Sequence, residues 1–210
     1  ETDKEEELEK ALSTILRTEI KTTGAGRTDT GVHAKKMFAH FDFDGEISEK
    51  LVHQLNSFLP PSIAVKKIFE VKEDFHARFS AKYRTYEYYI SLEKNPFSEK
   101  FAWQHWRKTL DVEKMNEACK ILFEYEDFGS FAKVGADNKT NICKIYHANW
   151  EQNGSELNFT ISADRFLRNM VRAIVGTMVE IGSGKLKPAD LRNVIEAKNR
   201  GVAGTSAPAH

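Results

Sequence analysis

Cysteine and long apolar runs are scarce in this sequence of 210 residues. Its two cysteines, Cys119 and Cys143, are too few for a disulfide framework or for a zinc site built on cysteine pairs. We expect both to be thiols of the hydrophobic core. No apolar run approaches the roughly 18 residues that a membrane-spanning helix requires, which excludes a transmembrane enzyme.

The opening of the chain lacks the features of a secretion signal. Its first ten residues hold six acidic side chains and two lysines, whereas a signal peptide begins with basic residues followed by an apolar stretch. We therefore expect a cytoplasmic protein with no membrane attachment. The content of 40% hydrophobic and 11% aromatic residues is typical of a globular protein, and the length fits one large domain or two small ones.

An excess of charge of either sign is also absent, because 31 basic residues balance 31 acidic ones. The six acids and two lysines at the start carry a net charge of −4, however, so the other 200 residues carry +4. Basic residues gather there beside glycine and aromatic positions, which fits either a local track for a polyanion or an ordinary solvated surface. These basic residues are Arg27, Lys35, Lys36, Arg78, Lys82, Arg84, Arg165, Arg168 and Arg172.

Hydrophobic periodicity predicts alternating helices and strands in the first half of the chain. The polar stretch around Asn95-Pro96 is the best candidate for a boundary, which divides the chain into residues 1–92 and 93–210. The elements expected before it are a helix ending near Thr23-Gly24, a strand over 39–43, a helix over 51–59, and strands over 63–71 and 83–92.

The second half resembles the first in the order of its elements. We expect a helix capped by Asp111, strands over 142–150 and 156–163, a long helix over 165–181 and a last helix near Pro188. Strands joined by hairpins and covered by helices on one side indicate an α+β fold. Its mixed sheet is expected to be mostly antiparallel and built from two similar halves.

The segment from Gly24 to Ala34 is the most informative part of the sequence. Three glycines allow its backbone to approach a ligand, and Arg27 and Asp29, two residues apart, point the same way in an extended chain. An arginine beside an aspartate favours the ionised carboxylate that a nucleophile requires. The alternative is an ordinary glycine-rich turn with an ion pair at the surface.

A rival interpretation takes Asp29-Thr30-Gly31 as the signature of an aspartic protease. Those enzymes place the triplet after an apolar strand and use two carboxylates that share a proton. Here Arg27 and Thr28 precede the triplet and the chain holds no second copy. Only dimerisation could supply a second aspartate, so this interpretation is weak.

The same segment resembles the catalytic motif of the tRNA pseudouridine synthase A family, Gly-Arg-Thr-Asp-Ala-Gly-Val-His-Ala. Thr30 is a small departure, since the family pattern has alanine there. The resemblance continues through Asp74–Ala81, Lys82–Tyr88 and Phe166–Gly182, so it extends over nearly the whole chain. It implies two ferredoxin-like halves with a catalytic cleft between them.

The resemblance also implies roles for individual residues. Asp29 would be the nucleophile that attacks a uridine, either at the sugar C1′ or at C6 of the base. Tyr86 would stack on the extruded base and take up or relay the C5 proton, although an aromatic packed in a sheet is its simpler interpretation. Arg172 would pair with Asp29, and Arg27 would fill the space that the flipped nucleotide leaves.

The remaining basic residues are candidates for RNA contacts. Arg165, Arg168 and Arg172 fall at i, i+3 and i+7, which predicts one basic face on the long helix, with a solvated face as the alternative. The complete RNA-binding set that we predict is Arg27, His33, Lys35, Lys36, Arg78, Lys82, Arg84, Arg165 and Arg168. We expect no metal, because His33, His40 and Asp42 have no recognised ligand spacing.

The family pattern implies a uridine-to-pseudouridine isomerase without a cofactor, which acts at positions 38 to 40 of the tRNA anticodon stem-loop and forms a homodimer. The alternative from another class is a non-catalytic RNA-binding module of the same fold. Family members also have a strand before the first helix and another beyond the Ala-Pro-Ala-His stretch. The sequence is then either a fragment or the ordered part of a longer chain, and we expect the second, because a sheet without these strands would expose unpaired edges.

Overall fold

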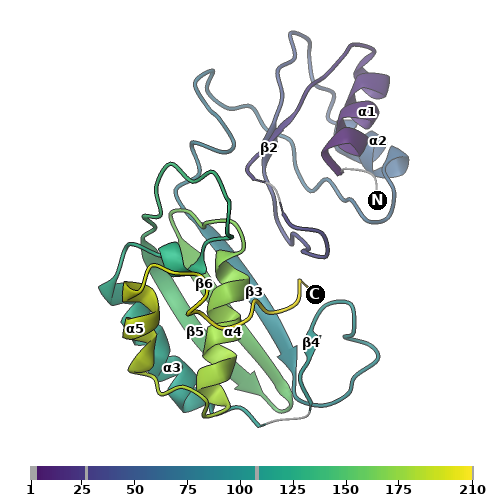
Figure 1. The fold of residues 1–210 in the computed structure, drawn as a ribbon. Helices are drawn as coiled ribbons and strands as arrows, with labels where there is room; N and C mark the ends of the chain where they lie inside the picture. The colour runs from purple at the N-terminus through teal and green to yellow at the C-terminus, as the bar shows by residue number, and fades with distance from the viewer. Residues whose placement is uncertain (1–3, 27, 107–108, 210) are drawn as a thin grey trace. The chain divides into compact units, whose positions relative to one another are not determined.

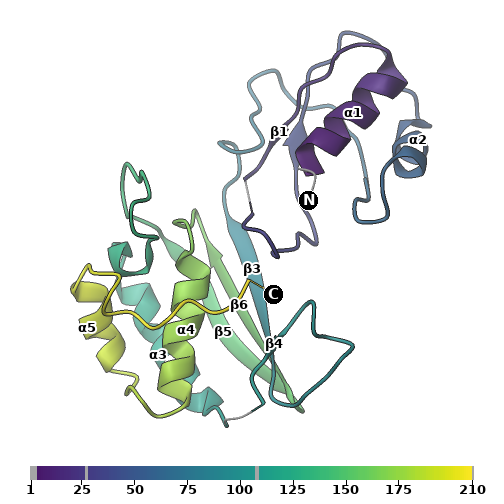
Figure 2. The same cartoon turned by 45° about the vertical axis from the view of Figure 1, so that its right-hand side comes forward.

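The computed structural model describes residues 4–26, 28–106 and 109–209. They form two compact units, Glu1–Thr28 with His33–Ala81 and Asp29–Val32 with Lys82–His210 (Figures 1 and 2). The short segment Asp29–Val32 therefore groups with the second unit although it lies early in the chain. The expected division after residue 92 differs from this, because it would separate strand β3 from the β6 strand with which it pairs.

The first unit holds two helices and a small sheet. Helices α1 (Lys4–Leu16) and α2 (Leu51–Phe58) contribute Leu12 and Leu51 to its core. Strands β1 (Thr23–Gly24) and β2 (Ala39–His40) pair in antiparallel fashion. The core of this unit consists of Ala11, Leu12, Ile20, Leu51, Leu55 and Leu59.

Three predictions for the first unit are wrong, two in the length of the element and one in its existence. Helix α1 ends at Leu16, because Arg17 takes a φ of 57°, outside the helical region, and Ser13 Oγ then accepts a hydrogen bond from the Ile20 N–H at 2.9 Å. Strand β2 is only two residues long. The stretch 63–71 forms no strand, and within it the Asn56 side chain binds both the N–H and the C=O of Val65, at 2.7 and 2.8 Å.

The second unit is built on a four-stranded sheet in the order β4-β3-β6-β5. Its strands are β3 (Arg84–Ser91), β4 (Trp103–Gln104), β5 (Ile145–Asn153) and β6 (Glu156–Ala163). All pairs are antiparallel except β3 with β4, which is parallel. The predicted α+β class with a mixed sheet is thus confirmed, whereas the ferredoxin-like character of two halves stays a prediction.

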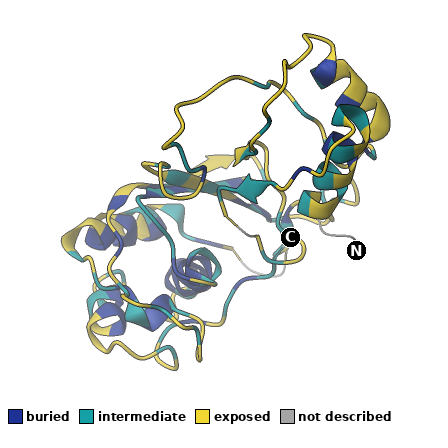
Figure 3. Cartoon of the chain, turned by 90° about the horizontal axis from the view of Figure 1, so that it is seen from above, coloured by how far each residue is buried: buried dark blue, intermediate teal, exposed yellow. Residues whose placement is uncertain are grey.

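Helices cover one face of this sheet (Figures 1 and 2). They are α3 (Val112–Ile121), α4 (Met170–Gly182) and α5 (Asp190–Glu196), and short 3₁₀ turns lie at Leu122–Glu124 and Gly129–Phe131. As predicted, the Asp111 side chain caps α3 by accepting the Lys114 N–H. Most of α4 is buried. Figure 3 colours buried segments dark blue and exposed loops yellow. Among the described residues, no helix is long and apolar enough to cross a membrane.

Helix α4 begins later than the sequence predicts. It starts at Met170 rather than near Arg165, and the residue before it, Asn169, has a left-handed φ of 68°. An L-residue in that conformation interrupts a right-handed helix, and asparagine tolerates it better than most residues. Earlier in the connection, the Asp164 carboxylate accepts the backbone N–H of Arg165 at 2.7 Å. Residues 165–169 consequently form a connection in front of the helix.

Both cysteines are free and buried, as the sequence predicts. Burial raises the pKa of Cys119 to about 12. Above the pKa of a thiol in the unfolded chain, the unfolded state therefore loses its proton while the folded state keeps it, and stability falls as the pH rises. We expect Cys119→Ala to reduce the loss of unfolding free energy between pH 8 and pH 11 by about 2 to 3 kcal/mol.

Urea unfolding of both proteins at the two pH values measures this difference. The unfolding free energies at pH 8 provide the reference, since the thiol is largely protonated in both the folded and the unfolded state at that pH. An equally steep loss of stability in Cys119→Ala would show that the thiol contributes nothing to the fall in stability at alkaline pH.

Candidate active site

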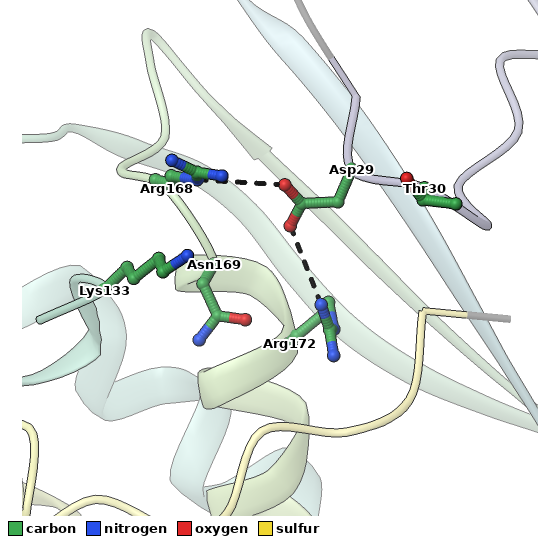
Figure 4. A pocket seen from close by; sticks show the side chains of 6 residues that line it. All are labelled: Asp29, Thr30, Lys133, Arg168, Asn169 and Arg172. Carbon is green, nitrogen blue, oxygen red and sulfur yellow. Dashed lines mark ion pairs between the residues drawn. The ribbon is translucent and has the colours of Figure 1, made fainter. Parts of the chain in front are cut away.

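A cavity of about 400 Å³ lies in the second unit and is lined by both acidic and basic side chains. This size falls within the range of roughly 300–1,000 Å³ that small-molecule sites span. Its lining consists of Asp29, Thr30, Lys133, Arg168, Asn169 and Arg172 (Figure 4). Three cationic side chains thus surround one carboxylate, which suits a ligand that carries negative charge.

The Asp29 carboxylate forms two ion pairs at this cavity. Arg172 Nη1 lies 3.6 Å from Oδ2, and Arg168 Nε lies 4.0 Å from Oδ1 (Figure 4). The Arg172 side chain is 29% exposed and that of Arg168 is 62% exposed, so the pair with Arg172 is better shielded from water. Two positive charges therefore face this one carboxylate.

The loop that carries Asp29 is held in a tight turn. Its carbonyl oxygen accepts the Val32 N–H at 3.0 Å, and Gly31 has a φ of 88°. A Cβ atom on Gly31 would also lie 3.3 Å from Cβ of Ala209. Glycine therefore suits this position twice, because it adopts a positive φ freely and leaves room for the neighbouring segment.

Tyr86 lies in β3 close enough to Asp29 to sense its charge. Its ring packs edge-to-face on Phe166 with the centroids 5.2 Å apart. Burial raises the pKa of Tyr86, and the negative charge of Asp29 adds to this effect against the opposing charge of Arg84. The phenol therefore keeps its proton at neutral pH.

Sequence comparison places these residues in a known family. A profile described as tRNA pseudouridine synthase matches residues 118–210. A tRNA pseudouridine synthase A of Parabacteroides distasonis is 52% identical over 208 residues, which cover 98% of this chain and 82% of that protein. This chain belongs to the tRNA pseudouridine synthase A family. Further members are those of Bacteroides fragilis, 54% identical over 96% of this chain and 81% of that protein, and of Bacillus subtilis, 38% identical over 98% and 85%.

In this member of the tRNA pseudouridine synthase A family, the three predicted arginines do not share a helical face. Arg172 lies in the first turn of α4, whereas Arg165 and Arg168 lie in the connection before it. Arg165 Nη1 donates to the Thr140 carbonyl at 3.4 Å and is not among the residues that line the cavity. The helical spacing failed here because the helix begins only after Asn169.

The other predicted RNA-binding residues are distributed over both units. Lys82 and Arg84 lie in the second, where Arg84 Nη1 donates to the Asp164 carbonyl at 3.1 Å. Arg27 lies outside the described residues. Those in the first unit, all exposed, are His33, Lys35, Lys36 and Arg78.

The sequence analysis missed two residues that line the cavity, Lys133 and Asn169. The Lys133 N–H donates to the Arg168 carbonyl at 3.0 Å, which fixes its loop beside the start of α4. Asn169 donates through Nδ2 to Ser206 Oγ at 2.6 Å. No local pattern marks either residue, because both reach the cavity through contacts between distant segments.

The described residues of this family member hold no group of three His, Cys, Asp or Glu side chains that could bind a metal ion. The residues at the cavity are a carboxylate, an amide, a hydroxyl and three cations. Such a set can provide a nucleophile, counter-ions and phosphate contacts.

Proposed function

We propose that this chain converts uridine to pseudouridine in tRNA, with Asp29 as the nucleophile. The observation that carries the proposal is the Asp29 carboxylate at the wall of a cavity, 3.6 Å from a partly buried arginine, in a chain of this family. The carboxylate lies at the cavity wall beside its counter-ion, where a flipped base that entered the cavity would meet it.

The reaction is an isomerisation and balances without any other reactant. The bond between C1′ and N1 of the uracil breaks, the base turns, and a bond between C1′ and C5 forms. C5 then loses its proton, and N1 gains one. Asp29 attacks either C1′ or C6, and both routes leave the carboxylate free at the end of the cycle.

Tyr86 is the residue that we propose to stack on the target base. It lies in a strand rather than a loop, and its ring is held by Phe166. Because burial raises the pKa of Tyr86, the hydroxyl keeps its proton at neutral pH, which favours stacking or relay of a proton over its direct abstraction.

The substrate site and the assembly are further parts of the proposal. The family pattern supports action at positions 38 to 40 of the anticodon stem-loop, two ferredoxin-like halves, a cytoplasmic homodimer and no cofactor. Lys133 and Arg168 line the cavity and are proposed to contact phosphates of the target strand. The other predicted basic residues are proposed to contact the RNA as well.

Release of hydrogen from C5 tests the activity directly. With tRNA that carries tritium at C5 of its uridines, each pseudouridine formed releases one tritium to water. We expect tritium release that depends on the enzyme and reaches a whole number of tritium atoms per tRNA molecule. Binding of the tRNA without any release would instead identify a non-catalytic RNA-binding module.

The salt dependence of tRNA binding tests the phosphate contacts. Each lost phosphate contact reduces the slope of log K against log salt concentration by roughly one. We expect Lys133→Ala to flatten this slope by about one unit, and the double variant Lys35→Ala with Lys36→Ala by roughly one to two units. Filter binding at several salt concentrations measures the slope.

Lys120→Ala is the matched control, because Lys120 is an exposed lysine in the last turn of α3 and does not line the cavity. It is expected to keep the wild-type slope. If Lys133→Ala and the double variant both keep the wild-type slope, these lysines belong to the solvated surface and do not contact phosphates.

A further inference from the structure

The segment 203–209 lies directly on the backbone of α4. A Cβ atom on Gly176 would lie 1.7 Å from the carbonyl oxygen of Thr205, and one on Gly204 would lie 2.9 Å from Cα of Thr177. The Gly204 N–H also donates to Thr177 Oγ1 at 2.9 Å. Only glycine permits these approaches, so the position of the segment on the helix is tightly defined.

Ala207 of this segment holds the guanidinium of Arg172. Its carbonyl oxygen accepts Nε of Arg172 at 2.7 Å, while its N–H donates to the Arg172 carbonyl at 2.9 Å. Because the guanidinium is planar, a bond at Nε fixes the direction of the other two nitrogens. Nη1 is left 3.6 Å from Asp29, and Figure 4 shows Arg172 between that carboxylate and the segment.

Ser206 connects the same segment to the start of α4. Its hydroxyl oxygen accepts Asn169 Nδ2 at 2.6 Å and Arg200 Nη2 at 2.8 Å. Arg200 Nη1 in addition donates to the Ala203 carbonyl at 3.2 Å. The hydroxyl of Ser206 therefore joins three parts of the chain directly beside the residue that orients Arg172.

The far end of the segment is also anchored. The Tyr88 hydroxyl in β3 donates to the Pro208 carbonyl at 2.8 Å, and Ala209 touches the Asp29 loop at Gly31. One segment thus contacts both the arginine and the loop of the aspartate. A shift in it would change the distance between the two charged groups.

We propose that Ser206 and Arg200 are positioning residues for the reaction, which keep the Ala207 carbonyl in place and so direct Arg172 at Asp29. The inference rests on the proposed function. Neither side chain lines the cavity, so both act through Arg172 rather than on the RNA. Small displacements of a catalytic group of this kind reduce turnover much more than they reduce binding.

Ser206→Ala tests this inference, with Ser206→Thr as the variant that keeps the hydroxyl. We expect Ser206→Ala to lower kcat between roughly tenfold and a hundredfold with little change in KM for tRNA. Ser206→Thr should restore kcat to within about threefold of the wild type.

Ser183→Ala is the matched control, since Ser183 bonds to the Glu180 carbonyl at the other end of α4. It should keep the wild-type kcat and KM. If Ser206→Ala does not fold, Arg200→Gln decides the question with the same readouts. Its side chain is only partly buried, and it removes the charged donor to Ser206 while keeping an amide.

Wild-type kcat in the folded variant would overturn the inference, even if its melting temperature fell, because that combination means a structural role alone. The wild-type enzyme is measured beside it by tritium release. Absence of release from the wild type contradicts the proposed function itself, whereas release with an unaffected Ser206→Ala contradicts only the positioning role.

Discussion

We expect Asp29→Asn to abolish pseudouridine formation, with a loss of at least roughly 10⁴-fold in kcat. An amide nitrogen or oxygen cannot replace the carboxylate as the nucleophile, and the side chain keeps nearly the same size. Binding of tRNA should stay within about threefold of the wild type, because phosphate contacts by other residues supply most of the affinity. Single-turnover tritium release and filter binding measure the two effects separately.

Asp44→Asn is the matched control for this variant. It makes the same chemical change at an exposed residue outside the cavity lining, and it should leave both measurements unchanged. Turnover by Asp29→Asn at the wild-type rate would remove Asp29 from the mechanism. A joint loss of binding and turnover would assign it to RNA contact.

Arg172→Met should lower kcat by roughly 10²- to 10³-fold. The change removes the better-shielded of the two charges beside Asp29 and leaves only Arg168, which is more distant and more exposed. The measurements are kcat and the affinity for tRNA, with Arg172→Lys as the variant that keeps a charge without the planar donors.

Arg192→Met controls for the loss of an arginine ion pair as such. Arg192 binds Glu124 through two hydrogen bonds of 2.6 and 3.0 Å on an exposed surface of the second unit. That pair has closer contacts than the one at Asp29, yet its removal should leave turnover unaffected. Weaker tRNA binding by Arg172→Met at an unchanged kcat would limit Arg172 to RNA positioning.

The elements that sequence predicts well are those in which local signals agree. Strand β6 alternates buried residues with less buried ones along its whole length, and helix α3 has both an apolar face and the Asp111 cap. In these elements the backbone preference and the burial pattern point to the same structure. Their boundaries consequently match the predicted ones closely.

Predictions fail where a side chain or a single backbone angle overrides the periodicity. The apolar alternation over 63–71 favours a strand, but Asn56 takes both polar groups of Val65. The pattern over 165–181 favours one helix, but the left-handed Asn169 divides it. Neither effect is visible in hydrophobic spacing, because each depends on one residue and its long-range partners.

The candidate site also contains residues that the sequence predicts and residues that it does not. The motif around Asp29 is contiguous, so it could be found in the sequence, and its proximity to Arg172 followed from the family pattern. Lys133 joins this region through a backbone hydrogen bond and Ser206 through its hydroxyl, in both cases between segments far apart in the chain. Side chains that act through such contacts carry no local signature and emerge only from the three-dimensional structure.

Chemical mapping of pseudouridine in tRNA tests the central claim most directly. Unmodified tRNA is incubated with the full protein, and each pseudouridine is then located at single-nucleotide resolution, with Asp29→Asn in parallel. We predict new pseudouridine at positions 38 to 40 of the anticodon stem-loop with the wild type and none with the variant. Bound tRNA that gains no pseudouridine from the wild type, or that gains it equally from Asp29→Asn, would contradict the account.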